Sequence, residues 1–154
     1  MANYCCAVRT NYFRVKDADK FRKFMGRAMA CEDSISVWEK DSGDGGKLYG
    51  FGCYSPILGV GPPDDSDSIT DSEKDNLMGD EYDYEAFLEG LSEIVADDDA
   101  IIIFESGNEK LRYVTGLAEI ITSKETRSED IETVAVKIAS EMLGNPSWKT
   151  DMWY

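Results

Sequence analysis

The chain has 154 residues, a formal net charge of −15, 42% hydrophobic and 31% charged residues, and no histidine. This length and balance fit one soluble globular domain with an ordinary hydrophobic core. Because histidine is absent, Ser-His and Cys-His catalytic pairs are excluded, and so is the commonest metal ligand. No apolar run reaches the roughly 18 residues of a membrane helix, and the first residues lack the pattern of a signal peptide, so we expect a cytoplasmic protein.

Residues 4–54 predict a strand, a helix and a hairpin. The stretch from Tyr4 to Val15 is rich in β-branched and aromatic side chains, which favours a strand. Asp17 can cap a helix, and the residues at helical spacing behind it are apolar, namely Phe21, Phe24, Met25, Ala28 and Met29. Two strands follow, SISVWEK and KLYGFGCYS, and the Gly- and Asp-rich DSGDGG between them predicts a hairpin loop.

After Pro56 the composition changes to proline, glycine, serine and aspartate, which predicts a long mobile acidic loop at about 58–81. A second amphipathic helix follows, with apolar residues Tyr84, Phe87, Leu88, Leu91, Ile94 and Val95. Its glutamates fall on the opposite, outward side. This helix should lie beside the first one, whose outward side is basic.

The C-terminal part predicts two more strands and a third helix. AIIIFES is a short continuous apolar run, which favours a strand covered on both faces, and KLRYVTGLAEIITS predicts a longer strand across a turn at GNE. The third helix has an apolar stripe made of Ile131, Val134, Ala135, Ile138, Ala139, Met142 and Leu143. Ser128 or Thr126 can cap it and Gly144 can end it. We expect this helix to cover a sheet face, and the tail SWKTDMWY to dock.

The element order β-α-β-β-α-β-β-α predicts a single α+β domain over residues 1–154. Its first six elements match a ferredoxin-like βαββαβ core, in which right-handed crossovers give the strand order 4-1-3-2. The fifth strand would extend this core by pairing antiparallel with the fourth, and the third helix would form its C-terminal extension.

The strand KLYGFGCY resembles the signature of the RNA recognition motif, a family with the same βαββαβ order. The matching positions are Lys47, Tyr49, Gly50, Phe51 and Tyr54, and the departures are Leu48 and Gly52. Strand alternation puts Tyr49 and Phe51 on one face, where that family stacks bases. The resemblance implies a single-stranded nucleic-acid-binding module that uses this aromatic face. The alternative is that a helix covers the face, and both residues belong to the core.

The negative charge is concentrated in one part of the chain. Residues 64–99 contain 15 carboxylates and one lysine, whereas the rest of the chain is close to neutral. The surface predicted to bind a basic partner consists of Asp64, Asp65, Asp67, Asp71, Asp80, Glu81, Asp83, Glu85 and Glu89. The alternative is a solvated surface whose helix glutamates pair with Lys20, Lys23 and Arg27 at little net energetic gain.

Signs of catalysis and of metal binding are weak. The four cysteines lack C-x-x-C spacing, and the acidic segments lack the calcium-loop spacing, so we expect free thiols, no metal and no cofactor. Glu105 precedes a turn that returns Lys110, Arg112 and Tyr113, for which cross-strand ion pairing is the ordinary explanation. We therefore expect a protein that is not an enzyme.

Four segments (RTNYFRVKD, GFGCY, DDDAIIIFESGNEKLRYVTG and LGNPSW) together resemble small acidic uncharacterised proteins encoded on bacterial mobile elements and phages, a group in which the acidic loop is the variable part. That resemblance brings no catalytic residues. It implies a protein-binding accessory protein, of the kind that inhibits host restriction or CRISPR defence, acting through its acidic surface as a monomer or homodimer.

Overall fold

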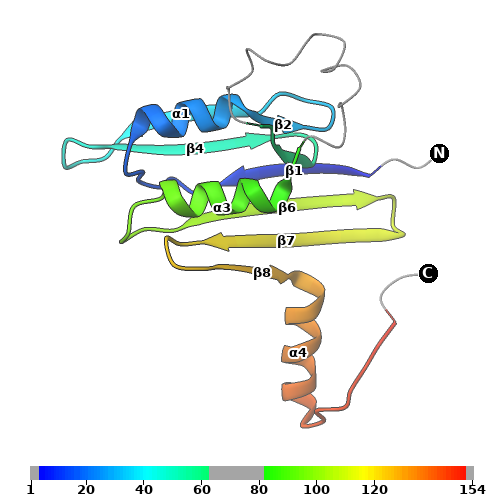
Figure 1. Cartoon of the computed structure of the whole chain (residues 1–154). Coiled ribbons are helices and arrows are strands. Elements are labelled where there is room, and N and C mark those ends of the chain that lie inside the picture. The colour runs from blue at the N-terminus through cyan, green and yellow to red at the C-terminus, as the bar shows by residue number, and fades with distance from the viewer. Residues whose placement is uncertain (1–3, 63–81, 152–154) are drawn as a thin grey trace.

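The structure is a computed structural model that describes residues 4–62 and 82–151, and most of the predicted acidic loop lies outside these residues. It confirms the α+β class: a six-stranded sheet has helices on one face, and a small two-stranded sheet lies beside them (Figure 1). The strands of the large sheet run in the order β3-β4-β1-β6-β7-β8, and all neighbours pair antiparallel.

The large sheet consists of β1 (Cys5–Thr10), β3 (Ser36–Asp41), β4 (Lys47–Cys53), β6 (Ile101–Glu109), β7 (Tyr113–Ile121) and β8 (Thr126–Asp130). The small sheet pairs β2 (Ala28–Ala30) with β5 (Ile57–Val60). The helices are α1 (Ala18–Gly26), α3 (Tyr84–Ile94) and α4 (Ile131–Leu143).

Four element boundaries differ from the predictions. The first helix ends at Gly26, because Ala28 and Met29 form a strand that pairs with β5. Strand β5 itself occupies the start of the predicted acidic loop. The GNE segment continues β6 and keeps its pairing with β7. The turn lies at Lys110, whose φ of 51° is left-handed. The polar segment 126–130 forms the sixth strand, and Asp130 replaces the predicted caps of α4.

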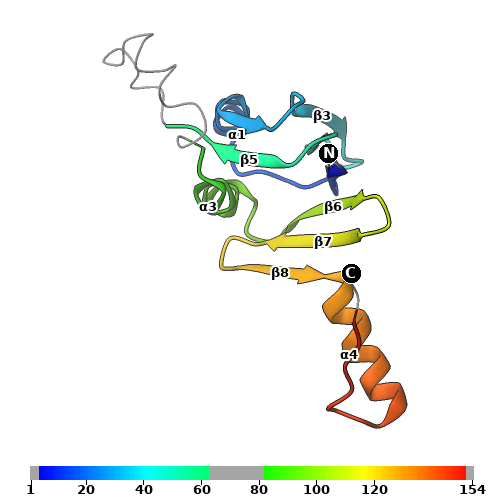
Figure 2. The ribbon, with the colours of Figure 1, turned by 90° about the vertical axis from the view of Figure 1, so that its right-hand side faces the viewer.

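The hydrophobic core lies between the large sheet and the two helices α1 and α3, which run side by side on one of its faces (Figures 1 and 2). Its centre is aromatic: Phe13, Phe21, Phe51 and Phe87 have no exposed surface. The Phe13 ring meets the Phe21 ring edge-on at 5.6 Å between centroids, and Phe24 stacks on Phe87 at 5.8 Å. Phe51 of β4 meets both Phe13 and Phe87 edge-on, so this cluster of rings joins both helices to β4.

The ring of Phe24 in α1 packs directly onto Gly90 of α3. A Cβ atom at this position would lie 2.3 Å from Cε2 of Phe24 in α1. Because the Phe24 ring is held against Phe87, it has little freedom to move away. Glycine at position 90 therefore sets the distance between the helices, although glycine is a poor helix former.

The third predicted helix, α4, does not cover the sheet, which corrects that expectation. It begins directly after β8, projects beyond the edge of the sheet (Figure 2) and has no buried residue. Asp130 caps it by accepting hydrogen bonds from the backbone N–H and the hydroxyl of Thr133, at 2.7 and 2.8 Å. In the predicted docking tail, Trp148 is partly buried, but its described neighbours are exposed.

We expect Gly90→Ala to destabilise the protein. Overpacking costs about 1–3 kcal/mol, which exceeds the ~1 kcal/mol that alanine gains over glycine in a helix. Gly26→Ala is the matched control, because no atom lies within 4 Å of its added Cβ, and it should be neutral or stabilising. Urea denaturation of both variants measures the difference. Equal stabilisation by the two substitutions would contradict the close approach.

Candidate protein-binding surface

The predicted aromatic platform is buried, which corrects that alternative. Tyr49 and Phe51 share one face of β4, as the alternation predicts, but they are only 4% and 0% exposed. Phe51 meets Phe87 of α3 edge-on at 5.9 Å, and the Tyr49 ring lies 5.2 Å from Phe21 of α1. The helices α1 and α3 cover this face, and a base cannot stack on it in this structure.

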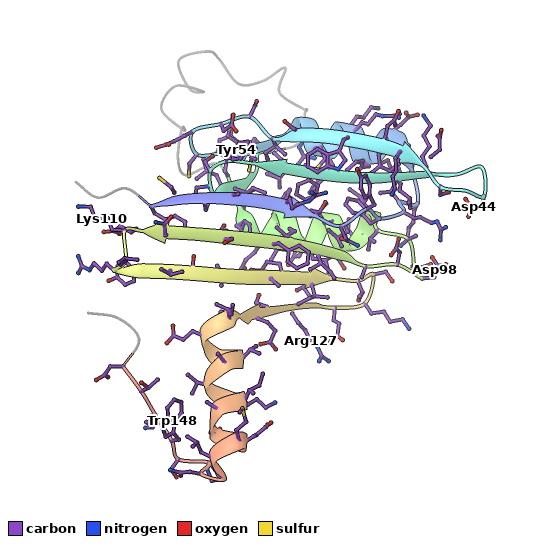
Figure 3. The ribbon with its side chains drawn as sticks, turned by 180° about the vertical axis from the view of Figure 1, so that it is seen from behind. Asp44, Tyr54, Asp98, Lys110, Arg127 and Trp148 are labelled. Carbon is purple, nitrogen blue, oxygen red and sulfur yellow. The ribbon has the colours of Figure 1, made fainter. Side chains whose placement is uncertain are left out.

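The opposite face of the large sheet is uncovered in the described part of the chain. Figure 3 looks onto this face, with α1 and α3 behind the sheet. We call it the open face. Strand register assigns to it Ala7 and Arg9 of β1, Trp38 and Lys40 of β3, Gly50 and Gly52 of β4, Phe104 and Ser106 of β6, Gly116 and Ala118 of β7, and Arg127 and Glu129 of β8.

The glycines of β4 make room for Trp38. A Cβ atom at Gly50 would lie 2.5 Å from the indole Nε1, and one at Gly52 would lie 3.0 Å from the far edge of the ring. The Trp38 ring therefore lies flat across the strand instead of standing up from it. The Arg9 guanidinium carbon is 5.6 Å from the centre of the same ring, within cation–π range.

A hollow of about 470 Å³ lies beside Trp38 on the open face. Arg9, Phe104 and Ser106 line it from β1 and β6, and Asp33 and Tyr54 line its rim. Phe104 and Tyr54 are 49% and 83% exposed. This half of the open face thus combines aromatic rings with one cation and one carboxylate.

A second hollow, of about 340 Å³, joins the open face to α4. Phe104 and Ala118 line it from the sheet, and Ile131 and Val134 line it from the helix. Ile131 also packs on Gly116: a Cβ atom added to this glycine would lie only 3.2 Å from Cγ2 of Ile131. The open face and the apolar stripe of α4 therefore form one continuous surface.

The stripe of α4 is exposed along its whole length. Ile131, Val134, Ile138 and Met142 recur at helical spacing and are 63%, 39%, 49% and 83% exposed. An amphipathic helix normally buries such a stripe, and exposed apolar patches of this kind mark sites of association.

The predicted acidic surface is described only in part. Asp64, Asp65, Asp67, Asp71, Asp80 and Glu81 lie outside the described residues. Asp83 caps α3 by accepting a hydrogen bond from the backbone N–H of Ala86 at 3.1 Å. Glu85 and Glu89 are exposed on α3.

The α3 glutamates and the basic residues of α1 line a common groove of about 440 Å³, with Lys20, Lys23 and Arg27 on one wall and Glu89 and Glu93 on the other. None of the ion pairs among the described residues joins the two walls. Arg27 instead donates to the backbone carbonyl of Gly61 at 2.9 Å. The predicted pairing of these walls is therefore not formed.

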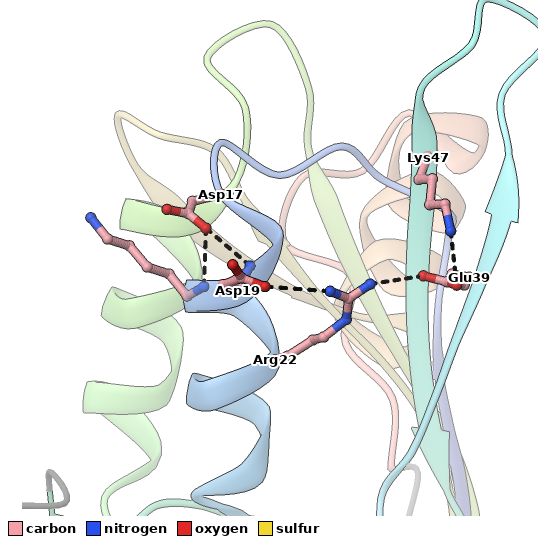
Figure 4. Close-up of polar contacts among 6 residues, drawn as sticks. Asp17, Asp19, Arg22, Glu39 and Lys47 are labelled. Atoms are coloured by element: carbon pink, nitrogen blue, oxygen red, sulfur yellow. Dashed lines mark hydrogen bonds and ion pairs between the residues drawn. The ribbon is translucent and has the colours of Figure 1, made fainter.

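Glu39 of β3 and Glu105 of β6 have different surroundings. Glu39 accepts hydrogen bonds from Lys47 at 3.1 Å and from Arg22 at 3.2 Å, and this ties α1 to the β3–β4 hairpin (Figure 4). The Lys47 hydrogen bond, followed by that of Arg22, holds the pKa of Glu39 below its ordinary value.

Glu105 does not meet Lys110, Arg112 or Tyr113 in any described hydrogen bond or ion pair. It accepts a hydrogen bond from the Tyr4 hydroxyl at 3.0 Å, and that hydroxyl also contacts Oγ1 of Thr115 at 2.7 Å. Burial raises the pKa of the Tyr4 phenol, and the nearby Glu105 carboxylate raises it further. Tyr4 lies against Gly107, where an added Cβ would be 2.4 Å from the hydroxyl, so this cluster fixes the start of the chain on β6.

Two of the four cysteines have the character of structural thiols, whereas Cys5 and Cys31 are exposed. Cys6 and Cys53 are buried, and burial raises the pKa of Cys6 to about 11, which suppresses its thiolate. Within residues 4–62 and 82–151, no three His, Cys, Asp or Glu side chains are grouped so that they could hold a metal ion. Over the same residues, no helix has the length and apolarity needed to cross a membrane.

The Glu39 ion pairs should make stability depend on pH. The folded-state pKa lies below the ordinary glutamate value of 4.5, so the pairs stabilise the fold above that value and lose this effect as the pH falls through the folded-state pKa. We expect Glu39→Gln to lower the urea midpoint at neutral pH and to have a shrinking effect in acid. Glu89→Gln, which breaks no described ion pair, is the control and should leave the midpoint unchanged. A Glu39→Gln effect that persists undiminished in acid would contradict the ion-pair explanation.

Comparison with known proteins assigns the chain to no family. No family model, no curated protein and no solved structure matches the chain significantly. Its function must therefore be inferred from the geometry of the open face, α4 and the acidic side of α3.

Proposed function

We propose that the chain acts by binding another protein, without catalysing a reaction, and that the open face together with α4 is its docking surface. One observation carries this proposal: a six-stranded sheet face, with no helix on it in the described chain, continues into a 13-residue helix that buries none of its apolar stripe. Sheets and amphipathic helices stabilise a fold by burying such surfaces against another element. A partner supplies the missing layer.

The acidic side of α3 is a second contact surface in this proposal, suited to a basic partner. Its support is that Glu85, Glu89 and Glu93 appear in none of the described ion pairs, even though a basic helix lies alongside. Carboxylates without intramolecular partners can engage arginine and lysine of another protein without first breaking a pair.

We also infer that the large sheet is an extended ferredoxin-like core. The support is that β1 lies between β4 and β6 and pairs antiparallel with both, while α1 and α3 share one face. In this interpretation β7 and β8 extend the sheet on the β6 side, and the β2–β5 pair is an insertion.

Site-specific photo-crosslinking tests the protein-binding proposal. A photoreactive amino acid in place of Phe104 should form protein adducts, because this position lies at the centre of the open face. The same residue in place of Glu125, which is exposed beyond the end of β7, is the matched control and should form few. A third position, Glu89, reports on the acidic side of α3. Absence of protein adducts at Phe104 would overturn the proposal.

A second candidate function is single-stranded nucleic-acid binding on the open face. It is favoured by two cation–aromatic contacts there: Arg9 beside Trp38, and Lys40 with its Nζ 4.3 Å from the centre of the Tyr12 ring. Aromatic rings beside cations can stack bases and contact phosphates.

If this candidate is right, the protein binds a fluorescently labelled oligonucleotide at low salt, and binding falls steeply as salt rises. Phe104→Ala should weaken binding about tenfold or more, since stacking contributes ~1–3 kcal/mol per base. Leu111→Ala, at an exposed turn residue away from the open face, is the control. No binding at low salt would eliminate nucleic acid as the ligand.

A further inference from the structure

We propose that the partner seated on the open face is a second copy of this chain, and that the two copies exchange their α4 helices, each laid across the open face of the other. This inference rests on the proposed protein-binding function, and it names the occupant of that surface. Its basis is that the stripe of α4 and the open face look toward the same side of the molecule.

Beyond its first turn, α4 cannot fold back onto its own sheet. β8 ends at Asp130 and α4 begins at Ile131, so no connecting residue lies between them. Folding α4 back would break the hydrogen bonds from Thr133 to Asp130 and remove Ile131 from Gly116. The stripe of α4 therefore needs a sheet from another molecule.

A two-fold axis that runs parallel to the strands, at the edge of β8, lets both copies bury their α4 stripes at the same time. Ile131 and Val134 line the second hollow together with Phe104 and Ala118, which places the stripe on the open-face side of the sheet. Rotation about this axis puts each α4 opposite the partner's open face, while the two copies of the second hollow meet at the centre. Such an interface is self-complementary and closes with two subunits.

The dimensions of the two surfaces agree. Thirteen helical residues extend about 20 Å at ~1.5 Å each, and six strands spaced about 4.8 Å apart are about 24 Å wide. The six strands average seven residues, or about 23 Å, so the open face covers about 550 Å².

With these dimensions, the residues near the end of α4 lie opposite residues of complementary chemistry on the open face of the second copy. Met142 lies about 16 Å from the start of α4, and β1 lies about 14 Å from β8. Met142 therefore falls over the hollow beside Trp38 of the second copy, where its exposed thioether becomes buried against aromatic rings. Glu141, beside it, comes within reach of Arg9, so a carboxylate meets the cation of the open face.

Light scattering coupled to size-exclusion chromatography tests the exchange. The wild-type protein should elute with twice the 17.2 kDa mass of one chain. Ile138→Asp in the stripe and Phe104→Asp on the sheet should each give a monomer. Ser140→Asp, which adds the same charge on the opposite side of α4, should remain dimeric. Circular dichroism melts verify that each variant is folded, which is expected because Phe104 and Ile138 are each 49% exposed.

A second pair of variants tests the register and does not depend on the apolar positions. Arg9→Glu and Glu141→Arg should each weaken the dimer in a dilution series, and the double variant should restore it. A monomeric wild-type protein, a dimer that survives Phe104→Asp, or a double variant no tighter than the singles would overturn the exchange. Photo-adducts with a different protein at Phe104, from a protein that is monomeric, would overturn the exchange while supporting the protein-binding function.

Discussion

The two-residue alternation of β4 is the constraint on which the rest of the molecule depends. One side of the strand carries Tyr49 and Phe51, which are large and apolar, and the other carries Gly50 and Gly52. The aromatic side holds α1 and α3 through a cluster of rings, and the glycine side admits only the flat Trp38 ring. Because both helices pack on the aromatic side, no helix or strand of residues 4–62 and 82–151 covers the opposite face of the sheet.

The distribution of charge follows the same division. The net charge of −15 is borne largely by residues 64–99, whereas the open face carries Arg9, Lys40 and Arg127 beside few carboxylates. The ion pair between Arg22 of α1 and Glu39 of β3 lies on the helix side and is half-exposed, so its contribution to stability is small. An acidic protein thus has one apolar and locally basic face, which is a surface that can receive an acidic chain, including its own.

Sequence patterns predicted most helices and strands well, but they predicted poorly which helices cover the faces of the sheet. Helical spacing identified α1, α3 and α4, and alternation placed Tyr49 and Phe51 on one side of β4, because both periods are properties of the local chain. Which face a helix covers is a long-range outcome, and the apolar stripe of residues 131–143 wrongly suggested that this helix covers the sheet. The segment 126–130 is polar and has no strand pattern; it pairs with β7 because that strand offers a free edge. The role of Trp38 had a signal in the two glycines, but only the register of β3 with β4 shows which ring fills the space.

The two edge strands of the large sheet, whose outer backbone groups could pair with another strand, carry charged side chains. β3 ends the sheet on one side with Glu39, Lys40 and Asp41, and β8 ends it on the other with Arg127, Glu129 and Asp130. Charged edge strands discourage the edge-to-edge pairing that extends sheets from molecule to molecule. Since the apolar surface lies on a face and on a projecting helix, association through it saturates once that face is covered. The same chain that exposes a long hydrophobic stripe is thereby protected against fibrous growth, and its unburied surface can be conserved for recognition at little risk of aggregation.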